Sequence, residues 1–306
     1  MDLKQLEYIV KIAEENNITR AAEKLFITQS ALNQQLLKLE KELGAPLFVR
    51  SRNNWHLTEA GEIYVDHAKR IMRLKKDAYS RIKDIIGAKE GKLTIGLTPE
   101  RGTDMFAAIY PAFYKLYPHV KIEPLEMPVK QQQLEISRGQ LDIGFLTLQD
   151  FQKTDDCYIP IGCEPIILAV PQAHPLAHKG GKLGEALPPI PLSALAADSF
   201  AIMQQGSTLR EIYDRLTAEE GVEPNILLES RSCRTLFEMV AEGICCSVIP
   251  MSYAKPDAGV SFFALSPNPV WEVAASYKKG SYLSLAAREL IALSAGYWSG
   301  RLTGQS

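Results

Sequence analysis

Residues 18–58 read ITRAAEKLFITQSALNQQLLKLEKELGAPLFVRSRNNWHLT. Two short helical patterns meet at a turn around Phe26 and Ile27, and Gly44-Ala45-Pro46 stops the second pattern before a basic, Asn-rich hairpin. This order of elements is typical of a winged helix-turn-helix, which lays one helix in the major groove of DNA. The stretch is a small part of the 306-residue chain, so the length of the remainder indicates a second function beside DNA binding.

Local signals place three helices in this N-terminal module. Apolar residues at helical spacing predict the first helix, and they are Leu3, Leu6, Ile9, Val10 and Ala13. Asn16-Asn17 ends this helix, and Thr19 is a suitable N-cap for a short second helix through Leu25. Thr28 is a suitable N-cap for a third helix to about Leu43.

The third helix has one apolar face and one polar face. Its leucines recur at positions that share a buried stripe, and they are Leu32, Leu36, Leu39 and Leu43. Recognition helices present short polar side chains to base edges and phosphates near their N-terminal end. The candidate DNA-binding residues here are Thr28, Gln29, Ser30, Asn33, Gln34 and Lys38. A solvated helix face is the alternative, so the prediction also depends on the turn and on the hairpin that follows.

The basic hairpin is predicted to form the wing. Residues 47–49 form its first strand and residues 55–57 its return strand. Arg50 and Arg52 lie near the tip, where they would reach phosphates or the adjacent minor groove. His56 is interpreted as a wing-surface residue, because no His or Cys follows at metal-ligand spacing.

A long helix is predicted to follow the wing. Thr58 would cap it, and it would run to Lys89 over about 48 Å at about 1.5 Å per residue. Tyr64, Ile71, Ala78 and Ile85 recur every seven residues, with Ala60, His67 and Leu74 between them. This heptad pattern favours packing against a second copy of the helix. Packing of the helix on its own body is the alternative.

Strand and helix patterns alternate after residue 90. The predicted strands are 93–97, 120–125, 141–148, 165–170, 200–203, 225–230 and 245–250, and the predicted helices are 104–117, 131–138, 207–220 and one near Leu236. Such alternation indicates a mainly parallel sheet with helices on both faces. A last strand from Val270 and a closing helix over 283–297 are expected to return to the first subdomain.

Charge and cysteine content limit the classes of protein. Residues 1–90 hold 16 Lys and Arg against 13 Asp and Glu, whereas the whole chain has a net charge of −2. A mildly basic head on an acidic body fits DNA binding by the head. The sequence shows no signal peptide and no apolar run of membrane-spanning length. Five cysteines without a CxxC pair favour a reducing cytoplasm.

The segment AAEKLFITQSALNQQLLKLEKELGAPLFVRSRNNWHLTEAGE, residues 21–62, resembles the N-terminus of LysR-type transcriptional regulators. The family usually has Ser-Gln-Pro-Ala-Leu-Ser-Arg-Gln where this chain has residues 28–35, TQSALNQQ. Ser30, Asn33 and Gln34 therefore replace the usual Pro, Ser and Arg. We expect the fold to tolerate these changes. Gln34 in place of the usual Arg removes a partner for a phosphate or a guanine, so a different base preference from better-known members is expected.

The body is similar to the family's effector domain. The matching residues are Phe113 with Tyr117-Pro118, then 139–144, 174–177 and 243–250. The resemblance implies an α/β fold overall, with an all-α winged helix-turn-helix at 1–58, a linker helix at 59–90 and an effector domain at 91–306. This domain would have two lobes like a periplasmic binding protein, lobe I about 91–162 and 269–306 and lobe II about 163–268.

Ligands of open α/β sheets lie at the carboxyl ends of strands and near helix N-termini. Loops in such places give the candidate effector-binding residues Thr98, Pro99, Glu100, Arg101, Thr147, Gln205, Gly206, Ser207 and Thr208. The hydroxyls and free N–H groups at Ser207 and Thr208 suit a carboxylate, Arg101 could supply charge, and Glu100 could receive an amine. Ordinary helix capping by Ser207 is the alternative.

The resemblance implies a regulator whose binding to operator DNA is modulated by a small-molecule effector. A homodimer or homotetramer and RNA polymerase are the implied protein partners, and no cofactor, metal, membrane or enzymatic activity is expected. A solute-binding module with a head used only for oligomerisation is one alternative. A thiol-based redox sensor using Cys245 and Cys246 is another, although ICCSVI is typical of a buried strand in which cysteine acts as a small apolar residue.

Overall fold

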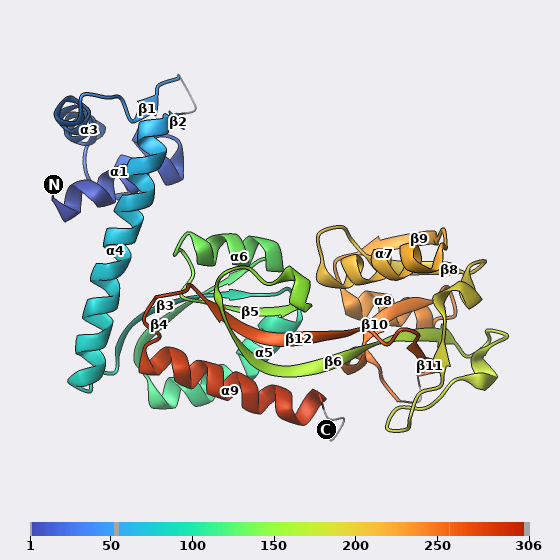
Figure 1. Cartoon of the computed structure of the whole chain (residues 1–306). Helices are drawn as coiled ribbons and strands as arrows, with labels where there is room; N and C mark the ends of the chain where they lie inside the picture. Colours follow the sequence, from blue (N-terminus) through green and yellow to red (C-terminus); the bar gives the residue numbers. More distant parts are fainter. Residues whose placement is uncertain (1, 52–54, 257, 303–306) are drawn as a thin grey trace. The chain divides into compact units, whose positions relative to one another are not determined.

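The protein divides into two units, Met1–Gly87 and Ala88–Ser306 (unit 1 and unit 2), in a computed structural model that describes residues 2–51, 55–256 and 258–302. Unit 1 contains three helices, a two-stranded hairpin and a long fourth helix (Figure 1). These elements are α1 (Leu3–Glu15), α2 (Ile18–Lys24), α3 (Gln29–Leu43), β1 (Phe48–Val49), β2 (His56–Leu57) and α4 (Glu59–Ile85). The architecture confirms the predicted helix-turn-helix with a following hairpin.

Capping residues explain where the helices of unit 1 begin and end. Thr28 accepts a hydrogen bond from the Ala31 N–H at 3.2 Å and Thr58 accepts one from the Gly61 N–H at 3.0 Å, as predicted. The prediction that Thr19 caps α2 is wrong. The Asn17 side chain takes that role by accepting from the Thr19 and Arg20 N–H groups at 2.9 and 3.1 Å.

Two further predictions in unit 1 need correction. Leu32, Leu36 and Leu39 are buried, but Leu43 at the end of α3 is 47% exposed and lies outside the core. The helix α4 ends at Ile85 rather than at Lys89, because Gly87 adopts a left-handed backbone with φ +69°. Glycine takes this conformation without steric cost, so a glycine directly after an apolar pattern is a helix stop.

Unit 2 is built on a mixed sheet with the strand order β4-β3-β5-β12-β6-β11-β7, and β10 pairs with β6. The strands of this sheet are β3 (Glu90–Leu97), β4 (His119–Glu126), β5 (Ile143–Leu148), β6 (Cys157–Pro171), β7 (Pro189–Ile190), β10 (Ser247–Pro250), β11 (Val260–Leu265) and β12 (Val270–Tyr277). The strands β8 (Ser199–Met203) and β9 (Asn225–Ser230) form a separate parallel pair. The sequence did not predict β7 or β11.

The expectation of a mainly parallel sheet is wrong. The strand β3 pairs in parallel with β4 and β5, but β12 runs antiparallel to both β5 and β6. The strands β10 and β11 also run antiparallel to β6. The reason is that β6 and β12 each pass from one half of unit 2 to the other (Figure 1), so β12 returns against the direction of β5.

Helices pack on the sheet and form hydrophobic cores with its strands. The helices of unit 2 are α5 (Arg101–Leu116), α6 (Val129–Ser137), α7 (Thr208–Glu220), α8 (Cys233–Ala241) and α9 (Leu285–Leu302). The side chains of α5 and α9 share one core with β3, β5 and β12, which confirms that the C-terminal segment returns to the first subdomain. The side chains of α7 and α8 share cores with β8, β10 and β11 in the second half.

No helix among the described residues is both long and apolar enough to cross a lipid bilayer. The long helix α4 carries charged side chains along its whole length, from Glu59 to Asp84.

Candidate functional site

The polar side chains at the start of α3 form a continuous exposed surface. Thr28, Gln29, Ser30, Gln34 and Lys38 are exposed, whereas Asn33 is half-buried. Ser30, Gln34 and Lys38 are spaced four residues apart on α3, so their side chains share one face. The buried leucines anchor the opposite face in the core of unit 1. This geometry suits a helix that enters a groove with its polar face outward.

The arginine that follows β1, Arg50, is held against α3. The Arg50 guanidinium pairs with the Glu40 carboxylate of α3 at 2.6 Å and lies 5.4 Å from the centre of the Trp55 ring. Glu40 also accepts a hydrogen bond from the Leu47 N–H at 2.8 Å, so one carboxylate joins α3 to the wing. A phosphate would compete with Glu40 for Arg50. Arg52 lies outside the described residues.

The turn before α3 lies at Phe26 and Ile27, as predicted, and it exposes Phe26. Phe26 is 95% exposed and has a φ of +56°, a backbone conformation that bulky residues rarely adopt. The neighbouring Ile27 is half-buried against the core of unit 1. The chain therefore turns sharply at Phe26 so that Ile27 can enter the core and Thr28 can cap α3.

The helix α4 has two different halves. In its N-terminal half, Val65 and Ala68 are buried and Tyr64 and Ile71 pack against the core of unit 1, so these heptad residues serve their own unit. In its C-terminal half, large apolar side chains are exposed, and they are Leu74, Tyr79, Ile82 and Ile85. Packing of the helix on its own unit is therefore confirmed for the N-terminal half, whereas packing against a second copy stays a prediction for the exposed C-terminal half.

In unit 2 the loop after β3 turns at Glu100. The Glu100 backbone has φ +58° and ψ −75°, and the Arg101 N–H donates to the Pro99 carbonyl at 2.8 Å. These values describe a γ-turn of the rare, strained kind. The Glu100 carboxylate accepts from the Ser232 hydroxyl and from the Cys233 N–H, the latter at 2.9 Å. Glu100 therefore caps α8, and each of its carboxylate oxygens accepts a hydrogen bond from the chain itself, so its binding of an amine stays a prediction.

Arg101 does not face the same loops as the other predicted effector residues. Its side chain is only 6% exposed and pairs with the buried carboxylate of Glu164. The guanidinium carbon lies 5.1 Å from the ring centre of Trp271 and 4.3 Å from that of Trp298. Arg101 therefore lies in the interior at the start of α5, and it does not line the cleft that contains Thr208.

The start of α7 is bound to β5. The Thr208 hydroxyl donates to the carbonyl of the buried Thr147 at 2.8 Å, which joins two predicted residues that lie far apart in the sequence. The Ser207 side chain accepts from the Arg210 N–H at 3.1 Å, so it performs the ordinary capping that was the alternative. Gln205 and Pro99 are exposed and Thr98 is half-buried, but none of these three side chains lines the cleft described next.

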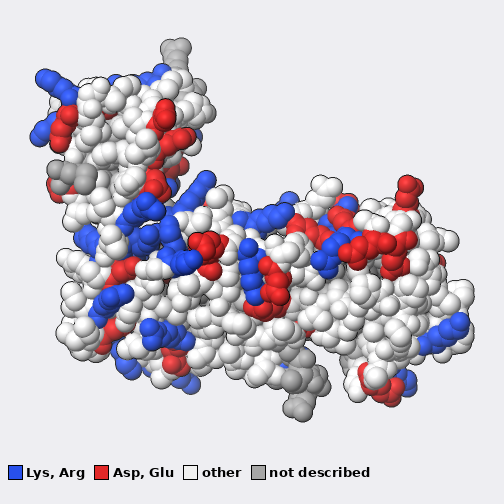
Figure 2. All heavy atoms as spheres, in the orientation of Figure 1, with Lys and Arg blue, Asp and Glu red and all other residues white. Residues whose placement is uncertain are grey.

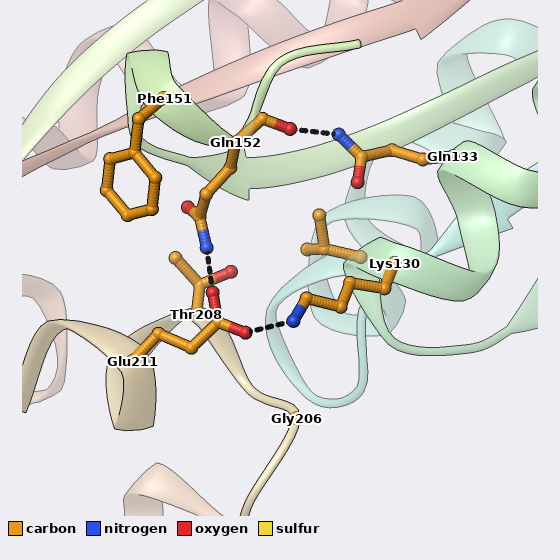
Figure 3. A pocket seen from close by; sticks show the side chains of 8 residues that line it. Lys130, Gln133, Phe151, Gln152, Gly206, Thr208 and Glu211 are labelled. Atoms are coloured by element: carbon orange, nitrogen blue, oxygen red, sulfur yellow. Dashed lines mark hydrogen bonds and ion pairs between the residues drawn. The ribbon is translucent and has the colours of Figure 1, made fainter. Parts of the chain in front are cut away.

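A cleft of about 250 Å³ lies between α6, the 3₁₀ turn Asp150–Gln152 and the start of α7 (Figure 3). Its lining consists of Val129, Lys130, Gln133, Phe151, Gln152, Gly206, Thr208 and Glu211. The Lys130 ammonium and the Glu211 carboxylate form an ion pair across it at 2.6 Å. The Gln152 amide donates to the same carboxylate at 2.5 Å, and the Gln133 amide donates to the Gln152 carbonyl at 2.7 Å.

The cleft contains two of the predicted effector residues, Gly206 and Thr208. The sequence interpretation missed the other six, although the rule that it used reaches two of them. Phe151 and Gln152 follow the carboxyl end of β5, only a few residues after Thr147. Lys130 and Gln133 could not be found in this way, because they come from the first turns of a helix that faces α7 only in the folded chain.

The adjacent thiols Cys245 and Cys246 are buried, with 5% and 2% of their surfaces exposed. Burial raises the pKa of both thiols, and it raises the pKa of Cys246 to about 12. A sensor thiol needs access and a lowered pKa. The prediction that these cysteines act as small apolar residues is confirmed.

Charges on the surface of unit 2 are mixed rather than segregated. On the face drawn in Figure 2, Lys and Arg side chains lie among Asp and Glu side chains. Exposed ion pairs of unit 2 include Lys92 with Glu123 at 2.6 Å and Lys255 with Glu238 at 2.6 Å. Such a surface differs from the basic stripe that tracks a nucleic-acid backbone.

Two sequence models of known families match the chain. One, described as LysR substrate binding domain, matches residues 87–298, and the other, described as bacterial regulatory helix-turn-helix protein of the lysR family, matches residues 3–62. The Hca operon transcriptional activator HcaR of Escherichia coli (strain K12) is 30% identical over 295 residues, which cover 96% of this chain and 97% of that protein. OxyR of the same strain, a DNA-binding transcriptional dual regulator, is 28% identical over 289 residues, with 92% and 91% covered.

Solved structures resemble the chain over nearly its whole length. A full-length OxyR variant from Pseudomonas aeruginosa has a TM-score of 0.69 and 25% identity, with 97% of this chain and 94% of that chain covered. Full-length CbnR in complex with its target DNA has a TM-score of 0.55 and 20% identity, with 97% and 99% covered. The second likeness concerns the fold alone.

Proposed function

Since this chain belongs to the LysR family of bacterial DNA-binding transcriptional regulators, we propose that it binds operator DNA as a homodimer or homotetramer and that a small carboxylate in the α6–α7 cleft controls this binding. RNA polymerase at the regulated promoter is the further protein partner that we propose. We place the protein in the cytoplasm, where its DNA target lies. The Lys130–Glu211 ion pair at the start of α7 is the observation that carries the choice of effector.

A carboxylate ligand fits the cleft for three reasons. The Lys130 side chain is 69% exposed and the Glu211 side chain 26% exposed, so their ion pair is weak and a ligand can displace Glu211 from Lys130. The cleft lies at the N-terminus of α7, where free N–H groups and the helix dipole favour an anion. Val129 and Phe151 offer apolar contacts to the body of the ligand.

Removal of each charge in the cleft, one at a time, tests this proposal. We expect Lys130→Met to weaken binding of a carboxylate effector by about tenfold, the cost of losing one hydrogen bond to a charged group. We expect Glu211→Gln to strengthen it by about threefold, because the competing carboxylate is removed and the lost ion pair is partly exposed. Isothermal titration of the full chain with carboxylates and amines of matched carbon skeleton measures both effects.

The sign of the two effects identifies the charge of the effector. An amine would show the reverse order, with Glu211→Gln weakening the affinity and Lys130→Met leaving it unchanged or higher. If neither variant changes the affinity for any effector that shifts operator occupancy in a footprint, the effector does not bind in this cleft. Lys179→Met serves as the control, because Lys179 is exposed and does not line the cleft.

The polar face of α3 and the wing are proposed to contact the operator. Gln29, Ser30, Asn33 and Gln34 would contact base edges. Thr28, Lys38, Arg50 and Arg52 would contact phosphates or the minor groove. A base contact and a phosphate contact differ in one measurable property. Only the phosphate contact changes the dependence of affinity on salt, because it releases a counterion.

Two substitutions on α3 separate these roles. We expect Gln34→Ala to cost about 1–3 kcal/mol of discrimination between operator and random duplex, with an unchanged salt dependence. We expect Lys38→Ala to weaken binding to every sequence and to lower the slope of log affinity against log salt by about 1. Fluorescence anisotropy at several salt concentrations measures both, and Lys121→Ala on β4 of unit 2 is the control. Equal salt slopes for Lys38→Ala and the unchanged protein would remove Lys38 from the interface.

A further inference from the structure

The turn between α2 and α3 holds the Phe26 side chain outside the core of unit 1. Leu25 and Ile27, its neighbours on either side, both pack against this core. Phe26 itself is 95% exposed, so its ring projects away from the core that receives its neighbours. Among the described residues no other large apolar side chain is exposed to this degree, and the next is Ile85 at 82%. The described chain therefore leaves almost the whole ring open to contact.

The backbone at Phe26 is strained, and the turn does not require phenylalanine. Its φ of +56° lies in the left-handed region, which is unfavourable for bulky side chains but not for glycine. Asn16 and Gly44, at two other turns of unit 1, have φ +48° and +70° and are of residue types that tolerate this region. Turns of helix-turn-helix units often contain glycine. Strain and an open ring at one residue point to a function for its side chain.

Phe26 adjoins the proposed operator-reading face of α3. Thr28, Gln29 and Ser30 follow it within four residues and are all exposed. Thr28 caps α3, so Phe26 lies two residues before the end of α3 that enters the major groove. The Cα atoms of Phe26 and Ser30 are at most about 14 Å apart along the chain, which equals about four base pairs at about 3.4 Å each. The ring therefore lies within reach of base pairs beside those that α3 reads.

Thymine is the matching partner for an exposed ring in the major groove, because its C5-methyl group is the apolar group that base pairs present there. Phosphates instead attract cations and hydrogen-bond donors, and the Phe26 side chain offers neither. Packing of the ring on this methyl group removes apolar surface of both from water. We propose that Phe26 packs against the C5-methyl group of a thymine beside the bases read by α3, and that it thereby contributes to operator specificity. This inference rests on the proposed binding of the operator through α3.

Deoxyuridine lacks only the C5-methyl group of thymine, so it removes the partner of Phe26 from the DNA without changing the protein. Each thymine in the duplex that the full chain protects in a footprint is replaced in turn, and binding is measured by fluorescence anisotropy. We expect one replacement in each half-site to weaken binding of the unchanged protein about fourfold, the effect of one methyl group that leaves an apolar contact. We expect Phe26→Asn to bind the thymine and deoxyuridine duplexes equally at this position.

Phe26→Asn also separates the DNA contact from the strain in the turn. Asparagine tolerates the left-handed conformation, so we expect the Tm of the unit 1 transition in the full chain to rise by a few degrees while operator affinity falls at least about fourfold. The salt dependence should stay unchanged, because no phosphate contact is lost. Phe26→Leu keeps an apolar side chain and should keep the response to deoxyuridine. Leu43→Asn is the matched control, since Leu43 is 47% exposed at the other end of α3.

Three results would overturn the thymine contact. They are an unchanged operator affinity of Phe26→Asn, an equal response of Phe26→Asn and the unchanged protein to every deoxyuridine, and a loss of affinity that follows a change in sedimentation coefficient, which would assign the ring to a second copy. Gln34→Ala reports separately on base reading by α3. If Gln34→Ala relaxes specificity and no thymine couples to Phe26, only this inference fails. If neither residue affects operator binding, the proposed role of α3 fails as well.

Discussion

Glu164→Ala is expected to lower the free energy of unfolding of unit 2 by about 3–5 kcal/mol, because it leaves a buried charge without its partner. Glu164 is 1% exposed and accepts hydrogen bonds from three groups of three different segments. These donors are Arg101 Nη1, the Trp271 indole N–H at 2.8 Å and the Ser252 N–H at 2.6 Å. Urea unfolding followed by the fluorescence of Trp271 and Trp298, in a Trp55→Phe background, measures the loss.

Two comparison variants show whether the unpaired charge of Arg101 causes the loss of stability in Glu164→Ala. The double variant Glu164→Ala with Arg101→Met is expected to be more stable than Glu164→Ala alone, because the orphaned charge is also removed. Glu123→Ala removes the surface ion pair with Lys92 at 2.6 Å and is expected to cost less than about 1 kcal/mol. A loss below about 1 kcal/mol for Glu164→Ala, or a double variant less stable than the single one, would show that Arg101 tolerates the loss of its partner.

Ile82→Glu combined with Ile85→Glu is expected to dissociate the proposed dimer and to lower operator affinity at least about 100-fold. The two side chains are 56% and 82% exposed on α4. Burial of an isoleucine contributes about 1.5–3 kcal/mol, and a two-fold interface contains each residue twice, so the change removes several kcal/mol. A protein that reads two half-sites then loses the gain from binding both together.

Sedimentation velocity and DNA binding, measured on the same preparations, check this expectation. The variant should sediment as a monomer and bind a single half-site about as well as the unchanged protein does. Asp66→Lys is the matched control, because Asp66 is an exposed charged residue on the opposite side of α4 from Ile82. A variant that remains dimeric would show that copies of this chain associate through another surface.

The sequence alone determined the local structure of this protein. The caps at Thr28, Thr58 and Ser207 act on N–H groups three residues away, and the stop at Gly44 follows from the backbone freedom of one residue. The spacing of apolar residues in α3 predicts in the same way that Leu32, Leu36 and Leu39 are buried. These features depend on neighbours within a few residues, so the pattern of the chain is sufficient to predict them. Thr19 failed as a cap because Asn17 competes for the same N–H groups.

Tertiary structure alone decided which distant segments meet and which of their charged side chains pair with each other. Glu100 lies 132 residues from Ser232, Arg101 lies 63 residues from Glu164, and Trp271 lies 107 residues from Glu164. The antiparallel return of β12 and the meeting of Lys130 with Glu211 have the same origin. A sequence pattern shows which side chains need burial or a partner, but the partner depends on which segments the folded chain brings together. The helix-turn-helix was therefore predictable from its own residues, whereas the lining of the cleft was not.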